Sequence, residues 1–196
     1  MIGHTWVPTE LIRTLKYFLL DNTKQKERLH QVDFIWAFLQ VNVKHRVFKK
    51  LDSRYVEYLP EYANYFGRPL RLKKSTCGMN NSGKLFADDV TNWLIDESGF
   101  NHSKCKMSIY YKYAPDGSKL VVLSYVDDCV YWYTSEELGN WFVDSIGNIF
   151  HVKLLGYPHW FMSIRISQLR EHYISVDQDI YATSIVTKYL DTDTIK

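Results

Sequence analysis

Two apolar runs that meet at a pair of acids constrain the fold of this chain more than any other feature. Residues 120–125 precede Asp127 and Asp128, and residues 129–133 follow them. Runs of this length and composition predict two strands of an antiparallel hairpin, with both carboxylates at its tip. Each carboxylate there disfavours ionisation of the other, and a divalent cation with hard oxygen ligands removes that cost. On its own, the dipeptide is equally typical of a solvent-exposed turn.

A third acid shifts this balance toward a metal site. Asp33 lies near the end of another apolar run, residues 29–35, and has no charge partner in that segment. A lone acid in such a place is usually a cap or a surface residue. One strand-end acid together with an acidic pair, however, is what a two-metal phosphoryl-transfer centre requires. One metal would lower the pKa of an attacking 3′-hydroxyl, and the other would stabilise the leaving pyrophosphate.

The remaining patterns predict an α+β fold. Apolar residues recur at helical spacing in four segments, so four helices are expected. The first spans residues 9–20 and the last residues 177–190. The second follows Ser82, a plausible N-cap, and the third follows Thr134, which has capping-box spacing to Glu137. Further strands are expected at residues 29–35, 109–113, 160–167 and 172–176. Gly99 is expected to end the second helix, and residues 52–69 to form a loop with a short strand. This order predicts antiparallel hairpins covered by helices on one side.

Composition adds limits rather than a function. A hydrophobic fraction of 46% and a charged fraction of 23% are ordinary for a folded protein, so disorder is not expected. The net charge of +2 does not by itself indicate a polyanionic partner. Basic clusters in residues 24–28, 44–50 and 68–74 could follow a phosphate backbone or could be solvated faces. Three cysteines without a CxxC spacing, and no signal peptide or long apolar span, favour a reducing compartment, cytoplasmic or nuclear.

Five segments resemble reverse transcriptases of the Ty1/copia retrotransposon type. QVDFIWAFLQ at residues 31–40 is similar to the family motif Q-x-D-V-x-x-A-F-L, and LKKSTCGMNN at 72–81 to L-x-K-S-L-Y-G-L-K-Q. YVDD at 125–128 is the family's Y-V-D-D box. FHVKLLG at 150–156 resembles F-x-M-K-D-L-G, and WFMSI at 160–164 resembles F-L-G-I. The segments follow the family's order over roughly residues 9 to 190.

The resemblance implies a polymerase palm, an antiparallel sheet packed against helices, and assigns roles to individual residues. Asp33, Asp127 and Asp128 would be the catalytic acids and would bind two Mg²⁺ or Mn²⁺ ions, with the Phe34 carbonyl as a further ligand. Phe38 would block a ribonucleotide 2′-hydroxyl, although its spacing alone favours a core Phe. Gly78 would approach the nucleotide, or would be an ordinary turn glycine. The residues expected near primer and template are Lys73, Lys74, Tyr125, Val126, Lys153 and Gly156.

The resemblance also implies a single palm-type domain over residues 1–196, truncated at both ends. Fingers residues that hold the dNTP would precede Thr9, and the thumb and an RNase H domain would follow Leu190. Weak dNTP binding is therefore expected. Partners would be an RNA or DNA template-primer, dNTP and the missing regions of the parent polyprotein.

This sequence departs from the family motifs at several places. Cys77 replaces a Tyr, Gly83 lies where A-P-R is common, Leu154 replaces an acid and Ser163 replaces a glycine. These departures weaken predictions about primer and template contacts more than those about metal binding. Two other functions stay open: an inert remnant that binds nucleic acid nonspecifically at most, and a metal-dependent phosphohydrolase or nuclease using the same acids.

Overall fold

The computed structural model describes residues 8–52, 54, 57–104, 108–170 and 173–189. The chain forms two compact units, one made of Met1–Ile35 and Leu94–Lys196, and the other of Trp36–Trp93. Each unit is described by itself below. In the part of the chain that the structure describes, no helix is both long and apolar enough to cross a membrane.

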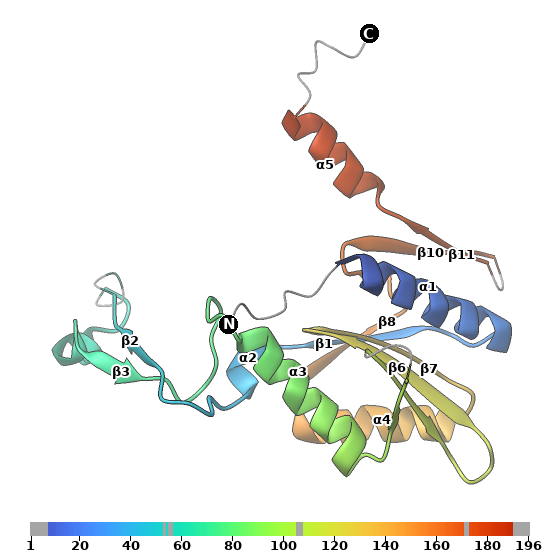
Figure 1. Ribbon diagram of the computed structural model, residues 1–196, viewed down its shortest axis with the longest axis horizontal. Helices are drawn as coiled ribbons and strands as arrows, with labels where there is room; N and C mark the ends of the chain where they lie inside the picture. The colour runs from blue at the N-terminus through green and yellow to red at the C-terminus, as the bar shows by residue number, and fades with distance from the viewer. Residues whose placement is uncertain (1–7, 53, 55–56, 105–107, 171–172, 190–196) are drawn as a thin grey trace. The chain divides into compact units, whose positions relative to one another are not determined.

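A six-stranded antiparallel sheet forms the centre of the first unit (Figure 1). In spatial order its strands are β4 (Asn101–His102), β5 (Ile109–Tyr113), β6 (Lys119–Tyr125), β7 (Asp128–Tyr133), β1 (His30–Phe34) and β8 (Val152–Gly156). The three strands predicted around residues 109–133 and the strand predicted at residues 29–35 are confirmed. The predicted hairpin is also confirmed, because β6 pairs with β7 up to Tyr125 and Asp128 and leaves a two-residue connection.

Helices cover both faces of this sheet, so the prediction of helices on one side is wrong. One face of β6 and β7 packs with α1 (Pro8–Gln25), and fully buried Trp132 and Phe18 belong to this core. On the other face lies α4 (Glu136–Ile149), whose buried Phe142 ring is 4.9 Å from that of Tyr131. Figure 1 shows α1 and α4 on opposite sides of the sheet. Because β6 and β7 carry apolar side chains on both faces, each face needs a cover.

A second, three-stranded sheet packs on the α1 side. It consists of β9 (Trp160–Phe161), β10 (Ile164–Arg170) and β11 (Tyr173–Asp177), in the order β11-β10-β9. Phe161, Ile164 and Ile166 are buried in the same core cluster as Trp132. The strands predicted at residues 160–167 and 172–176 are thus confirmed, with a turn interrupting the first. The predicted final helix is α5 (Asp179–Tyr189), none of whose described side chains is buried.

The second unit holds α2 (Ala37–Gln40), β2 (Phe48–Lys50), the 3₁₀ helix η2 (Pro60–Tyr65), β3 (Pro69–Arg71) and α3 (Ser82–Asn92). Antiparallel β2 and β3 form a two-stranded ribbon, and α2 contacts α3. The chain then continues through the π-helical turn η3 (Trp93–Glu97). Gly99 follows with a φ of 69°, so the predicted helix stop is confirmed.

Both predicted helix caps are wrong by one residue. The N-cap of α4 is Ser135, and the Thr134 hydroxyl instead accepts a hydrogen bond from the Lys119 amide at 2.8 Å. The N-cap of α3 is Asn81, and the Ser82 hydroxyl donates to the Thr76 carbonyl at 2.6 Å. In each case two neighbouring residues suit the N-cap position, and local sequence does not distinguish them.

Candidate active site

Strand register places two of the predicted acids side by side. Asp33 on β1 lies directly opposite Asp128 on β7. On their other sides, Asp128 is opposite Tyr125 of β6, and Asp33 is opposite Lys153 of β8. Opposite residues in an antiparallel sheet point to the same face, with Cβ atoms about 4.5–5.5 Å apart. The six-stranded sheet therefore presents Tyr125, Asp128, Asp33 and Lys153 as one row across four strands.

The third acid, Asp127, lies in the turn beside this row. Its backbone carbonyl accepts a hydrogen bond from the Phe34 amide at 3.0 Å, which ties the β6–β7 turn to the end of β1. The Asp127 residue is exposed, whereas Asp33 and Asp128 are partly buried. Val126, the other turn residue, has a φ of 51°. Positive φ at the first residue of a two-residue hairpin usually calls for Gly or Asn, so a β-branched Val there is strained.

The electrostatics of the site converge on Asp128. Burial raises the pKa of the Asp128 carboxyl, and the charge of Asp127 raises it further. A hydrogen bond from the Gln31 side chain lowers this pKa, the charge of Asp33 raises it, and the Met162 amide lowers it. On balance the Asp128 pKa lies above its ordinary value. A carboxylate under this repulsion is one that a nearby cation would stabilise.

The donor atoms suit a hard divalent cation, but the arrangement is not a complete metal cage. Carboxylate oxygens are the ligands that Mg²⁺ prefers. Among the described residues, however, no group of three or more His, Cys, Asp or Glu side chains is placed to hold an ion. The fit of the acids to a metal therefore rests on their chemistry and on the raised Asp128 pKa. Phe34, whose carbonyl was predicted as a ligand, is buried with its ring 5.5 Å from that of Phe150.

Strand β8, which sequence patterns did not predict, carries two of the expected primer or template residues. Lys153 is exposed and opposite Asp33. Gly156 is opposite Gln31, with a register shift between Gln31 and Val32. Its φ of 72° explains why glycine is needed at this bulge.

Four predicted residues lie in the second unit. Phe38 is in α2 and is partly buried, and Gly78 has a φ of 86°. Lys73 is exposed. The ammonium group of Lys74 donates to the Gln40 carbonyl at 2.7 Å, at the C-terminal end of α2. This contact gives Lys74 a local structural role, because a cation there satisfies a helix-end carbonyl.

Comparison with known families decides the class of protein. A family model described as Reverse transcriptase (RNA-dependent DNA polymerase) matches residues 4–195. The chain belongs to this reverse transcriptase family. No match was found among curated proteins or among solved structures. The family predicted from the sequence motifs is therefore confirmed, and the Ty1/copia type is consistent with the match.

Membership sets the general chemistry of this reverse transcriptase. At the family level the match supports an RNA-directed DNA polymerase that acts on a nucleic-acid template-primer with dNTP substrates. Reverse transcriptases as a family generally use divalent metal ions. In this chain Asp128 and Asp33 lie opposite each other, and the Asp127 backbone is hydrogen-bonded to the end of β1.

One residue of the site was missed by the sequence reasoning. Gln31 is only 5% exposed, and its amide nitrogen donates to the Asp128 carboxylate at 3.1 Å. Gln31 precedes Asp33 by two residues and therefore shares its face of β1. That spacing was the available signal, because it places Gln31 beside Asp33 on one face of the strand. A polar side chain that is buried there needs a hydrogen-bond partner.

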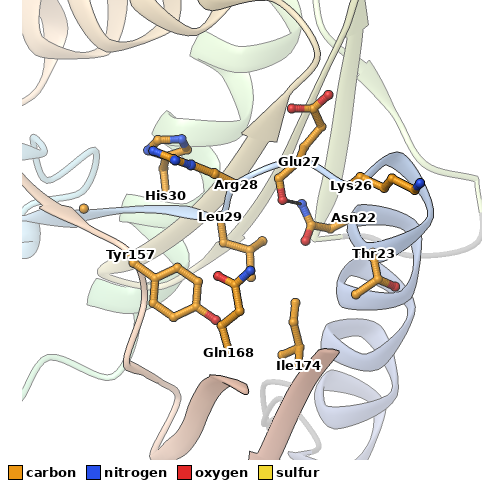
Figure 2. Close-up of a pocket in the computed structure, with 11 residues that line it drawn as sticks. Asn22, Thr23, Lys26, Glu27, Arg28, Leu29, His30, Tyr157, Gln168 and Ile174 are labelled. Atoms are coloured by element: carbon orange, nitrogen blue, oxygen red, sulfur yellow. Dashed lines mark hydrogen bonds between the residues drawn. The ribbon is translucent and has the colours of Figure 1, made fainter. Parts of the chain in front are cut away.

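A cavity of about 550 Å³, lined by both polar and apolar groups, lies at the other end of β1 from Asp33 (Figure 2). The C-terminal part of α1 and residues 26–30 form one side, and Tyr157, Gln168 and Ile174 line the other. The Tyr157 hydroxyl is buried and has no hydrogen-bond partner among the described residues. None of the three predicted catalytic acids lines this cavity.

Proposed function

We propose that this chain is the palm-type catalytic region of a Ty1/copia-type reverse transcriptase, with both compact units in one domain. The reaction is attack of a primer 3′-hydroxyl on the α-phosphate of a dNTP, with release of pyrophosphate. The observation that carries the proposal is the pairing of Asp33 with Asp128, with Asp127 in the adjoining turn, in a chain of this family.

The three acids and the Phe34 carbonyl would hold two Mg²⁺ or Mn²⁺ ions. Bound metal would supply a lowered pKa of the 3′-hydroxyl and stabilisation of the leaving pyrophosphate. The protein contributes rigid placement of the acids. Asp33 and Asp128 are fixed by the β1–β7 ladder, and the hydrogen bond from the Phe34 amide fixes the backbone of Asp127. Rigid acids would help to hold the 3′-hydroxyl and the α-phosphate in a fixed geometry, and reactants held in this way react in an effectively unimolecular step.

Nucleotide selection and primer contact extend the proposal. The ring of Phe38 would exclude a 2′-hydroxyl by steric conflict, and Gly78 would allow a close approach of backbone to the nucleotide. Tyr125 and Lys153 flank the acids in the same row of the sheet, which supports their contact with the primer terminus. Val126, Gly156 and Lys73 complete the proposed primer and template contacts, whereas Lys74 would first have to leave the Gln40 carbonyl.

Template binding is supported by the charge of the second unit. Trp36–Trp93 contains ten Lys and Arg against five Asp and Glu, whereas the whole chain has a net charge of only +2. On its β2–β3 ribbon, Phe48 is opposite Arg71, and Lys50 follows Phe48 on the same face. All three residues are exposed. An aromatic ring between two cations suits a single strand, which stacks bases and presents phosphates.

The test is extension of a DNA primer on an RNA template with Mg²⁺ or Mn²⁺. Asp127→Asn should abolish extension without unfolding the chain, and Asp144→Asn, at an exposed acid of α4, is the matched control. Extension by the unchanged chain and the control alone would support the proposal. A folded chain that binds RNA but extends nothing, with binding unaffected by Asp127→Asn, would instead indicate an inert remnant. Cleavage of a phosphodiester without dNTP would indicate a nuclease.

A further inference from the structure

Gln31 connects one of the acids to a different sheet. Its amide nitrogen donates to the Asp128 carboxylate at 3.1 Å and to the Trp160 carbonyl at 3.1 Å. Asp128 begins β7 in the six-stranded sheet, and Trp160 begins β9 in the three-stranded sheet. The two N–H groups of one side chain therefore join the acid to β9.

A second contact links the same two places. The backbone amide of Met162, in the turn between β9 and β10, lies close enough to the Asp128 carboxyl to lower its pKa as a hydrogen-bond donor. Between Trp160 and Met162 lies Phe161, which is fully buried in the core cluster that also contains Trp132. The β9–β10 hairpin is thus anchored in the core, and from there it reaches Asp128 through Gln31 and Met162.

We propose that Gln31 is a positioning residue that fixes the Asp128 carboxylate against the β9–β10 hairpin, so that the acid and the hairpin move together. The clamp itself stands on these contacts alone, and its importance for catalysis rests on the proposed function. Displacement of the hairpin by a primer or another ligand would be transmitted to Asp128 through the Gln31 amide.

Glutamine suits this position because its amide has two N–H donors and both partners are acceptors. Glutamate would offer no donor when ionised. Methionine has a similar length but leaves the Asp128 carboxylate and the Trp160 carbonyl without this partner. A buried acceptor that loses its donor is costly, so the substitution should loosen the hairpin rather than merely remove a contact.

Side-chain amide exchange measured by NMR tests the clamp without requiring activity. In the unchanged, metal-free chain the Gln31 amide protons should exchange at least about tenfold more slowly than those of Gln168. The reason is that Gln31 donates to a charged carboxylate, and a hydrogen bond of that kind slows exchange by at least about this factor. Gln168 is an exposed residue of β10 and serves as an internal control. Asp128→Ala should speed exchange at Gln31 and at the Met162 backbone amide, and leave Gln168 unchanged. Gln31 exchange as fast as that of Gln168, or unaffected by Asp128→Ala, would overturn the proposal.

Metal affinity gives a second, independent measurement. Gln31→Met should weaken Mn²⁺ binding, followed by electron paramagnetic resonance, about 10- to 100-fold, as for outer partners of metal ligands. Gln168→Met should leave the affinity unchanged. Full affinity in a folded Gln31→Met variant would overturn the role of Gln31 toward the metal. If the unchanged chain binds no Mn²⁺, the proposed function fails, but amide exchange in the unchanged chain and in Asp128→Ala still decides the clamp.

Discussion

Replacing Ser163 by glycine should stabilise this protein, and the reason lies in one backbone angle. Ser163 is the second residue of the turn between β9 and β10, and its φ is 61°. Met162 before it has a φ of 54°, so both turn residues are left-handed, as in a type I′ turn. Ser163 is exposed, so its replacement removes no buried packing. The family motif has glycine where Ser163 stands, and the turn geometry supplies a physical reason for that glycine.

The expected gain follows from two opposing contributions. An L-residue in the left-handed region costs about 1–2 kcal/mol, which glycine does not incur. Glycine loses about 0.5–1 kcal/mol more backbone entropy on folding than an ordinary residue. The net increase in the free energy of unfolding should be about 0.5–1 kcal/mol. For a chain of this length that corresponds to roughly 1–4 °C in the melting temperature.

Thermal unfolding followed by circular dichroism measures this shift. The matched control is Ser145→Gly, the same chemical change inside α4, where backbone angles are helical. Glycine there should lower the free energy of unfolding by roughly 0.5 kcal/mol, because its helix propensity is below that of serine. The two variants should therefore move in opposite directions. A loss of stability in Ser163→Gly comparable to that in Ser145→Gly would refute the turn argument.

Three further predictions concern the acids and the basic ribbon. Asp128→Asn should raise the stability of the metal-free chain at neutral pH. The pKa of Asp128 is raised in the folded chain, so the protonated acid favours folding at low pH. That contribution is lost as the pH rises through the raised pKa, whereas the asparagine side chain of the variant does not titrate. Denaturant titrations from about pH 3 to about pH 8 should show the advantage of Asp128→Asn growing with pH, and a constant difference would contradict this cause. Val126→Gly should relieve the strain of the positive φ in the β6–β7 turn and raise the melting temperature. It should also slow primer extension, because the turn that carries the acids becomes less rigid. Faster extension would argue against a role for the strain. Lys50→Ala combined with Arg71→Ala should reduce the salt slope of single-stranded RNA binding by about 1.4, which is about 0.7 for each lost phosphate contact. Lys16→Ala, at an exposed position of α1, should leave the slope unchanged.

The parts of the fold that sequence predicted are those specified by local pattern. The hairpin at residues 119–133 is recognisable because apolar residues fill both strands and two acids mark the turn. Strand β8 was missed because Lys153, Leu154, Leu155 and Gly156 are exposed on an edge strand, where no buried face imposes a pattern. The prediction placed helices on one face of the sheet only. The continuous apolar runs of β6 and β7, however, put buried side chains on both faces, so both faces need a covering layer.

The site divides in a similar way. The motif resemblance selected the three acids, and strand register then placed Asp33 opposite Asp128. Gln31 could not be assigned from local sequence, because its partners Asp128 and Trp160 are 97 and 129 residues away. Its place two residues before Asp33 puts it on the same face of the strand, but does not say which distant group it contacts. Identifying that partner requires the pairing of β1 with β7 and the packing of β9.

The backbone strain around the acids suggests what this arrangement is selected to preserve. Val126 precedes Asp127 in one turn and has a φ of 51°. Met162, whose amide lowers the pKa of Asp128, belongs to another turn and has a φ of 54°. Left-handed L-residues are costly, and they persist where the surrounding structure over-determines them. Here the surrounding structure is one core, which contains Leu123 and Val130 of the strands that lead into the β6–β7 turn, and Phe161 next to the β9–β10 turn. Because both turns are flanked by buried residues, we expect the core to hold them in their strained conformations, so that backbone and strand register keep the acids in place.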